Sequence, residues 1–188
     1  MVKPATKPAH MVRKLIAFQV GVTIFGMFTG LVFGGGDMTS LLIVMAMIAI
    51  GMHMVMVATA MYEYGQGDYI RVSSNRVTHS SLRGLNIALI ANSLNIVLGV
   101  ISVISKVFVN NIGFFEQGLL EGDITYYPVI WAEIHAISSG IAAIIQAGYL
   151  GLYTLYFSGN PLYFLFVPLP SIAVAAVAYQ LGYKSEQT

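Results

Sequence analysis

The sequence predicts an all-α fold, a polytopic bundle of transmembrane helices, on three observations. Of the 188 residues, 57% are hydrophobic and 9% are charged, and the mean hydropathy is +0.77. The apolar residues form segments of about 20 residues or more, the length that crosses a bilayer core of about 30 Å. The charged residues lie mainly between these segments. An ordinary soluble domain carries more charge, so we expect one integral membrane domain over residues 1–188.

Five apolar segments are expected to span the membrane: residues 15–33, 41–62, 85–109, 128–157 and 161–183. Basic residues precede the first segment, which is too long for a signal peptide and lacks a cleavage site, so we interpret it as a retained span. The fourth is long enough to tilt or to project from the membrane. Gly159, Asn160 and Pro161 are typical of a helix stop, cap and start, and predict a tight hairpin before the fifth. Pro168 and Pro170 are expected to kink or interrupt the fifth.

The charges of the connections predict the orientation. Lysine and arginine are concentrated in the N-terminal tail and in residues 64–84, whereas residues 110–127 include acidic side chains and no basic ones. Cytoplasmic connections carry the excess of basic residues, so we place the N-terminus inside and, with five spans, the C-terminus outside. Aromatic residues in the 110–127 loop predict an outer contact surface. We expect a prokaryotic plasma membrane, and the lack of acidic residues before Asp37 also allows an organellar inner membrane.

Composition excludes several kinds of site and partner. The chain has no cysteine, which excludes disulfides, iron–sulfur clusters, thiolate zinc sites and thiol catalysis. The net charge of +1 provides no electrostatic footprint for nucleic acid. The sequence contains no Walker A, GxGxxG, HExxH or GxSxG motif. The expected partners are therefore membrane lipid and other integral membrane subunits.

Polar stripes within the third and fourth spans mark the first candidate site. In the third span, polar and small residues recur every three or four positions and therefore share one helix face. Such faces allow membrane helices to approach closely and to form hydrogen bonds with one another. We expect interhelical contacts from the following residues: Asn92, Asn95, Ser102, Ser139 and Gln146.

An ionisable cluster is expected near the outer leaflet. Lys106 lies near the outer end of the third span, and Glu133 and His135 lie about 7 and 10 Å below the start of the fourth. A charge inside a bilayer costs about 2.5–3.5 kcal/mol and therefore usually has a partner. We predict a Lys106–Glu133 ion pair with His135 nearby, as a satisfied structural network. The same groups could also relay protons or bind a ligand.

Two histidines within the spans, His53 and His135, suggest haem b or copper as alternatives. Imidazole and the thioether of Met56 would suit Cu(I). The histidines lie at depths of roughly 21 and 10 Å, which argues against axial ligation of one haem. Residues 95–105, NIVLGVISVIS, followed by a histidine-bearing helix from Pro128, resemble half of a haem A synthase module. That resemblance implies haem ligation by His53 and His135, but the glutamate-x-x-histidine-arginine pattern of the family is missing around His53.

The sequence contains no complete catalytic constellation. We therefore predict a non-catalytic integral subunit of a larger membrane complex, such as a respiratory or membrane monooxygenase assembly, which contributes helix packing and the outer contact loop. One alternative is a haem- or copper-binding redox protein that uses His53 and His135. The other is a small transporter or channel, with a path along the stripe from Asn92 to Lys106 and past the interrupted helix at Pro168.

Overall fold

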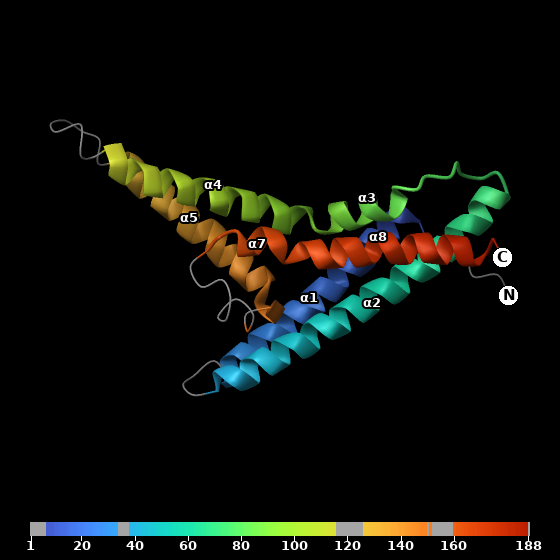
Figure 1. Cartoon of the computed structure of the whole chain (residues 1–188), viewed down its shortest axis with the longest axis horizontal. Coiled ribbons are helices and arrows are strands. Elements are labelled where there is room, and N and C mark those ends of the chain that lie inside the picture. The colour runs from blue at the N-terminus through green and yellow to red at the C-terminus, as the bar shows by residue number, and fades with distance from the viewer. Residues whose placement is uncertain (1–6, 34–37, 116–125, 150, 152–159, 188) are drawn as a thin grey trace.

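The fold is a bundle of helices, and the computed structural model contains no strand in the residues it describes, 7–33, 38–115, 126–149, 151 and 160–187. Figure 1 shows the elements, which in chain order are α1 (Pro8–Phe33), α2 (Thr39–Ser73), α3 (Arg83–Ala91), α4 (Ser93–Phe115), α5 (Tyr126–Ile145), the 3-10 turn η1 (Ala147–Tyr149), α7 (Tyr163–Phe166) and α8 (Pro168–Ser185). The predicted all-α class is confirmed.

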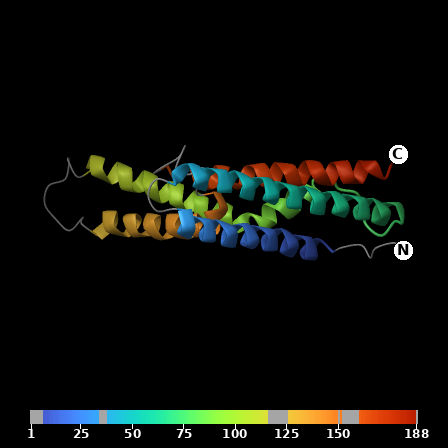
Figure 2. The ribbon, with the colours of Figure 1, turned by 90° about the horizontal axis from the view of Figure 1, so that it is seen from below.

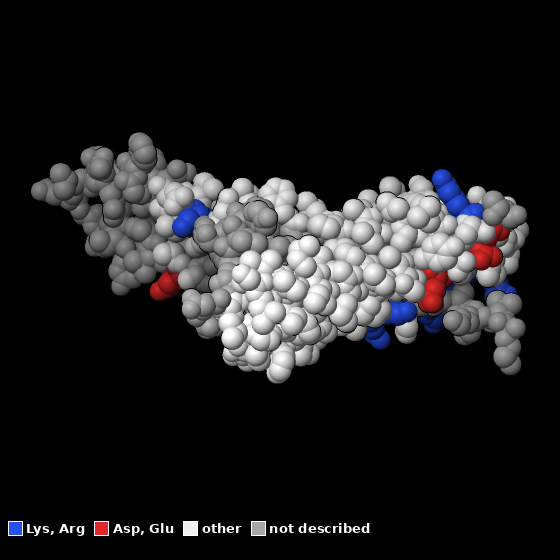
Figure 3. Space-filling model, turned by 60° about the horizontal axis from the view of Figure 1, so that its bottom comes forward, with Lys and Arg blue, Asp and Glu red and all other residues white. Residues whose placement is uncertain are grey.

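The length and composition of the helices are those of a multi-pass integral membrane protein. Four helices in the described part of the chain are long and apolar enough to cross a membrane, namely Pro8–Phe33, Ser40–Ser73, Ser93–Asn110 and Tyr163–Ser185. A shorter apolar helix, Ile130–Ile145, accompanies them. Figure 3 shows a broad uncharged surface between the charged residues at the two ends of the molecule. This surface is suited to the hydrocarbon core of a bilayer.

Helix α2 continues about three turns beyond the predicted end of the second span. Tyr64 and Asp68, in this extension, are buried against α8 although their neighbours along the chain are polar. Glycine allows the two helices to approach to backbone contact, because a Cβ on Gly65 would lie 2.2 Å from the carbonyl oxygen of Tyr179. Packing against α8, which a hydropathy pattern does not report, therefore extends the helix.

The third predicted span consists of two helices, α3 and α4, which meet at Asn92. The backbone N–H and the side-chain Nδ2 of Asn92 both donate to the carbonyl oxygen of Ala88, at 3.0 and 2.9 Å. A side chain that binds its own backbone in this way competes with regular helical pairing. The irregularity at Asn92 is slight, because the N–H of Ile96 still donates to the carbonyl oxygen of Asn92 at 3.0 Å.

Helix α5 is shorter than the predicted fourth span, because it ends at Ile145 and the chain continues as η1. Residues 152–159, including Gly159 of the predicted turn, lie outside the described part of the chain. Oδ1 of Asn160 accepts a hydrogen bond from the N–H of Leu162 at 3.0 Å, but the N-cap of α7 is Leu162 and the helix starts at Tyr163, two residues later than predicted. The predicted interruption at Pro168 is present, between α7 and α8. Val167 there keeps helical angles (φ −55°, ψ −44°).

The C-terminus lies at the same end of the bundle as the N-terminus, which corrects its predicted position on the opposite side. Figures 1 and 2 show both termini at one end. Near the end of α2, Gln66 donates from Nε2 to Oε1 of Glu186 at 3.0 Å. The physical reason is that α5 and the α7–α8 pair run in the same direction along the bundle. Four spanning helices with a fifth, shorter one therefore return the chain to its starting end.

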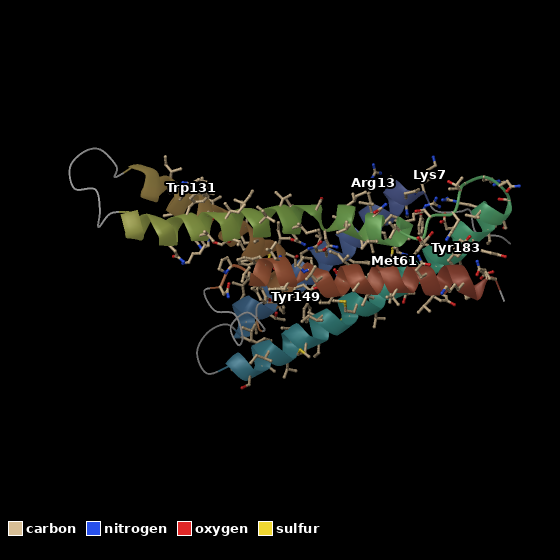
Figure 4. The ribbon with its side chains drawn as sticks, turned by 45° about the horizontal axis from the view of Figure 1, so that its top comes forward. Lys7, Arg13, Met61, Trp131, Tyr149 and Tyr183 are labelled. Carbon is tan, nitrogen blue, oxygen red and sulfur yellow. The ribbon has the colours of Figure 1, made fainter. Side chains whose placement is uncertain are left out.

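The basic end and the apolar core can be located from a few side chains. Figure 4 places Lys7, Arg13 and Tyr183 at one end of the molecule, which we call the basic end, and Trp131 at the other. One apolar cluster, around Met61 and Tyr179, joins α1, α2, α3 and α8. A second joins α1, α2, α5, η1 and α7, and its buried members are Val22, Ala49, Ala142, Tyr149, Tyr163 and Phe164. The second cluster surrounds the point where α5 ends, so the interruption of that helix lies inside the bundle.

Candidate functional site

The most unusual local structure is the interruption of α5, which we call the helix break and define as residues 146–149. All four of these residues are buried. Non-helical backbone at membrane depth is tolerated only where protein covers it, because its polar groups have no water to bind. The N–H groups of Gln146 and Tyr149 donate to the carbonyl oxygens of Ala142 and Gln146, both at 2.9 Å, whereas carbonyl groups at the interruption find their partners on other helices.

Helix α1 provides one of these partners and the space for the break. The hydroxyl of Thr23 donates to the carbonyl oxygen of Ile145, the last residue of α5, at 2.5 Å. Gly26 lies directly against the break, since a Cβ there would lie 2.2 Å from the carbonyl carbon of Ala147 and from the backbone nitrogen of Gly148. Thr23 and Gly26 lie about one turn apart on α1, so one face of that helix both caps α5 and admits the chain that follows it.

Helix α7 provides the other partner. The hydroxyl of Tyr163 donates to the carbonyl oxygen of Tyr149 at 2.7 Å. In return, Nε2 of Gln146 donates to the carbonyl oxygen of Phe164 at 3.1 Å. That carbonyl would face the N–H of residue 168 in a continuous helix, but Pro168 has none. Gln146 therefore makes an interhelical contact, as the sequence predicted.

The buried polar atoms His53 Nδ1, Asn95 Oδ1 and Gln146 Oε1 have no hydrogen-bond partner among the described residues. The exposed fractions of these residues are 5%, 2% and 1%. His53 meets the break directly, because its ring packs edge-on against that of Tyr149 with the centroids 6.3 Å apart; Figure 4 shows Tyr149 in the interior of the bundle. Buried polar atoms are normally paired, so such atoms indicate a place where a small polar ligand can bind.

His135 lies between α5 and α4, in a network of serines. Its Nδ1 donates to the carbonyl oxygen of Ser102 at 3.0 Å, and the hydroxyls of Ser102 and Ser105 lie 3.5 and 3.4 Å from the same nitrogen. Both serines are fully buried. Because a carbonyl oxygen can only accept, Nδ1 of His135 carries a proton. His135 thus joins two helices, and the predicted interhelical role of Ser102 agrees with this geometry.

The predicted ion pair of Lys106 with Glu133 is corrected by the structure. Among the described residues, the ion pairs present are Asp68 with Arg83 and Glu63 with Lys14. Lys106 instead lines an open groove of about 510 Å³ together with Asn110, Asn160, Pro161, Leu162 and two valines of α4. Glu133 lies on the exposed side of α5. Depth along the two helices, from which the pair was predicted, does not determine the direction in which each side chain points.

Two members of the predicted interhelical stripe bind within their own helix. Nδ2 of Asn92 donates to the carbonyl oxygen of Ala88, and the hydroxyl of Ser139 donates to that of His135 at 2.5 Å. A helical spacing of polar residues is compatible with hydrogen bonds between helices and with hydrogen bonds inside one helix, because serine and asparagine readily bind a carbonyl three or four residues earlier.

The candidate metal ligands are not brought together. His53 packs against Tyr149 and lines the cavity between α1, α2, α3 and α8. His135 instead contacts serines of α4. Met56 packs against the second apolar cluster. In the described part of the chain, no three histidine, aspartate or glutamate residues are grouped as a metal site.

The sequence did not predict the buried ion pair of Asp68 with Arg83 at the basic end. Asp68 is 1% exposed, and both of its oxygens accept from Nη1 of Arg83, Oδ1 at 2.6 Å. The hydroxyl of Tyr179 donates to Oδ2 of Asp68 at 2.6 Å, and Nη2 of Arg83 donates to the carbonyl oxygen of Thr78 at 2.7 Å. Burial lowers the pKa of Arg83, but the hydrogen bond and charge of Asp68 outweigh it and raise the pKa overall.

The sequence does contain one signal for this cluster. Met61, Tyr64 and Asp68 are spaced three and four residues apart, so a helix that continued past residue 62 would place the carboxylate on the buried face of α2. A buried carboxylate must be paired, which would have pointed to one of the arginines in the loop. The cluster fixes the loop between α2 and α3, residues 74–82, to α8. It has the character of a structural anchor.

Comparison with known proteins identifies no relative, because no family model, no curated protein and no solved structure matches this chain.

Proposed function

We propose that this chain is a non-catalytic integral subunit of a larger membrane complex and that the exposed face of α5 binds a helix of a neighbouring subunit. Ala132, Ala136 and Gly140 lie four residues apart on that face, and all three are exposed. A Cβ added to Gly140 would meet nothing within 4 Å. Small residues at this spacing allow another membrane helix to approach closely.

The observation that carries the proposal is Glu133, next to this ridge. Its side chain is exposed on a mainly apolar helix, and no described lysine, arginine or histidine pairs with it. A carboxylate that faces lipid is costly, so it favours contact with another chain. The partner that fits is therefore an apolar helix with small residues on one face and a basic or hydrogen-bond-donating side chain near Glu133.

The proposal also specifies the kind of host complex and the kind of membrane. We propose a respiratory or membrane monooxygenase assembly in a prokaryotic plasma membrane, with membrane lipid and integral subunits as the partners. The predicted outer contact loop would add to the interface, although residues 116–125 of it lie outside the described part of the chain. Subunits with oxidoreductase cofactors in the purified complex would support this narrower form, and their absence would contradict it.

The test compares two glycine variants in native membranes. Gly140→Leu blocks the proposed face, whereas Gly51→Leu alters an exposed glycine on α2, and a Cβ at either position meets nothing within 4 Å. Both variants should therefore fold. After extraction in mild detergent, native mass spectrometry should show about tenfold less partner bound to Gly140→Leu, equivalent to about 1.4 kcal/mol, and no loss for Gly51→Leu. A stable lone monomer of the unmodified chain would refute the proposal.

A second candidate function, a small transporter, is favoured by the helix break. Transporters often build substrate sites where membrane helices are interrupted. Oε1 of Gln146, within the break, lacks a partner among the described residues, as does Oδ1 of Asn95 on α4. Flux into proteoliposomes would test it, because Asn95→Leu should abolish transport. The adjoining cavity of about 10 Å³ is too small for a solute and favours the subunit proposal.

A redox role for His53 and His135 can be tested on the same preparation. A Soret band, or stoichiometric copper or iron in the purified chain, would establish that alternative. The separate surroundings of the two histidines favour neither a shared haem nor a shared copper ion.

A further inference from the structure

A small cavity lies among four helices, between the helix break and the basic end. Its wall comes from α1, α2, α3 and α8 and combines apolar side chains with four polar ones, Gln19, His53, Asn92 and Ser171. Each polar residue comes from a different helix or helix junction. The convergence of four polar side chains inside an apolar bundle is the observation from which the inference starts.

His53 is the least satisfied of these residues. Its side chain is 95% buried, since the residue is 5% exposed, and its Nδ1 has no hydrogen-bond partner among the described residues. The nearest aromatic contact, with Tyr149, is an edge-on ring contact and supplies no polar partner. A buried ring nitrogen without a partner is unfavourable, so a ligand that binds Nδ1 would be stabilised at this position.

The other polar residues can hold the same ligand. The hydroxyl of Ser171 donates to the carbonyl oxygen of Pro168 at 2.8 Å, and Nδ2 of Asn92 donates to that of Ala88. The single donor of Ser171 is thus used within its own helix and its oxygen remains able to accept, whereas Nδ2 of Asn92 has a second N–H that can still donate. Gln19 contributes an amide that can both donate and accept. The wall therefore offers two acceptors, Nδ1 of His53 and the hydroxyl oxygen of Ser171, and two side-chain amides that can donate, so it suits a ligand that donates twice and accepts twice.

The size of the cavity selects the ligand. Its volume is about 10 Å³, at the lower end of the roughly 10–15 Å³ that one water molecule requires. Larger solutes are excluded. The wall has no carboxylate or thiolate, which are the ligands that would favour a divalent metal ion. A water molecule can donate twice and accept twice, and so matches both the volume and the polar groups.

We propose that this cavity binds one water molecule, which donates a hydrogen bond to Nδ1 of His53 and is held by Gln19, Asn92 and Ser171. His53 is then a hydrated histidine inside the membrane bundle, protonated on Nε2. His135 is the opposite tautomer, because its Nδ1 donates to the carbonyl oxygen of Ser102. Water in this cavity links four helices that share no direct side-chain hydrogen bond at this level among the described residues.

Water-edited solid-state NMR on the full chain in lipid bilayers, with ¹⁵N-labelled histidine, tests the proposal. The chain has four histidines, of which His10 and His79 are exposed and serve as positive controls. His53 should show polarisation transfer from water, and its Nδ1 should have the shift of an unprotonated nitrogen. His135 should have a protonated Nδ1. Transfer to His10 and His79 without transfer to His53 would overturn the proposal.

Two variants separate a water in this cavity from water elsewhere. Gln19→Leu keeps His53 but replaces one polar wall by an apolar one, and Gln19 is only partly buried, so the helix should tolerate the change. The water signal at His53 should be lost. Gly21→Ala, on the same helix with nothing within 4 Å of its Cβ, should retain the signal. An unchanged signal in Gln19→Leu would show that the water is held by other residues and would overturn the assigned site.

Discussion

The side-chain amide of Gln146 donates a hydrogen bond to the carbonyl oxygen of Phe164 at 3.1 Å, across the space between α5 and α7. In an unbroken helix this carbonyl would accept from residue 168, where proline has no N–H to give. The donor missing from one interrupted span is thus supplied by the other. The two interruptions compensate each other.

This relationship predicts an energetic coupling between Gln146 and Pro168. Gln146→Leu removes the donor to a buried carbonyl and should lower the free energy of unfolding by about 1–3 kcal/mol. In a Pro168→Ala background, residue 168 can donate to Phe164, so the same substitution should cost less, with a coupling of about 0.5–3 kcal/mol. Unfolding in mixed micelles, followed by far-UV circular dichroism, measures all four proteins. An equal loss in both backgrounds would contradict the compensation.

The two ion pairs of the basic end should differ greatly in strength. Asp68 is buried, and Asp68→Ala leaves Arg83 and the hydroxyl of Tyr179 without their partner, so we expect a loss of about 3–5 kcal/mol. Glu63→Ala breaks an exposed pair with Lys14 at 4.0 Å and should cost about 0–1 kcal/mol. The same unfolding measurement compares them. Similar losses would mean that the Asp68 cluster is not an anchor.

The helix break should depend on the absence of a side chain at position 26. A Cβ on Gly26 would lie 2.2 Å from backbone atoms of the break, so Gly26→Ala should destabilise the protein by about 1–3 kcal/mol or more. Gly21→Ala provides the control on the same helix, since nothing lies within 4 Å of its Cβ. It should be neutral or stabilise by up to about 1 kcal/mol. A neutral Gly26→Ala would show that α1 does not approach the break this closely.

The network between α4 and α5 should depend on a donor at position 135. His135→Leu removes the hydrogen bond to the carbonyl oxygen of Ser102 and should lower the free energy of unfolding by about 1 kcal/mol. His135→Gln retains a donor and should recover most of that loss. Unfolding curves and the thermal midpoint of the two variants provide the measurement. Equal losses would assign His135 a packing role only.

Several properties follow from the chain without its tertiary structure. Hydropathy predicts the apolar spans, and the effect of Pro168 on its helix is local, so both were predicted correctly. The polar residue Gln146 was also expected at a helix contact, and the structure places it there. The common reason is that bilayer thickness, backbone chemistry and helical spacing act over a few residues at a time.

Other properties depend on residues that are far apart in the sequence. Asp68 is fixed by Tyr179, 111 positions later, and Gln66 binds Glu186, 120 positions later; these contacts extend α2 and bring the C-terminus back to the basic end. The separation of Lys106 from Glu133 likewise depends on how α4 and α5 turn toward each other. Depth along a helix is therefore determined by the sequence alone, whereas the direction of a side chain around the helix axis is decided by the helices that pack against it.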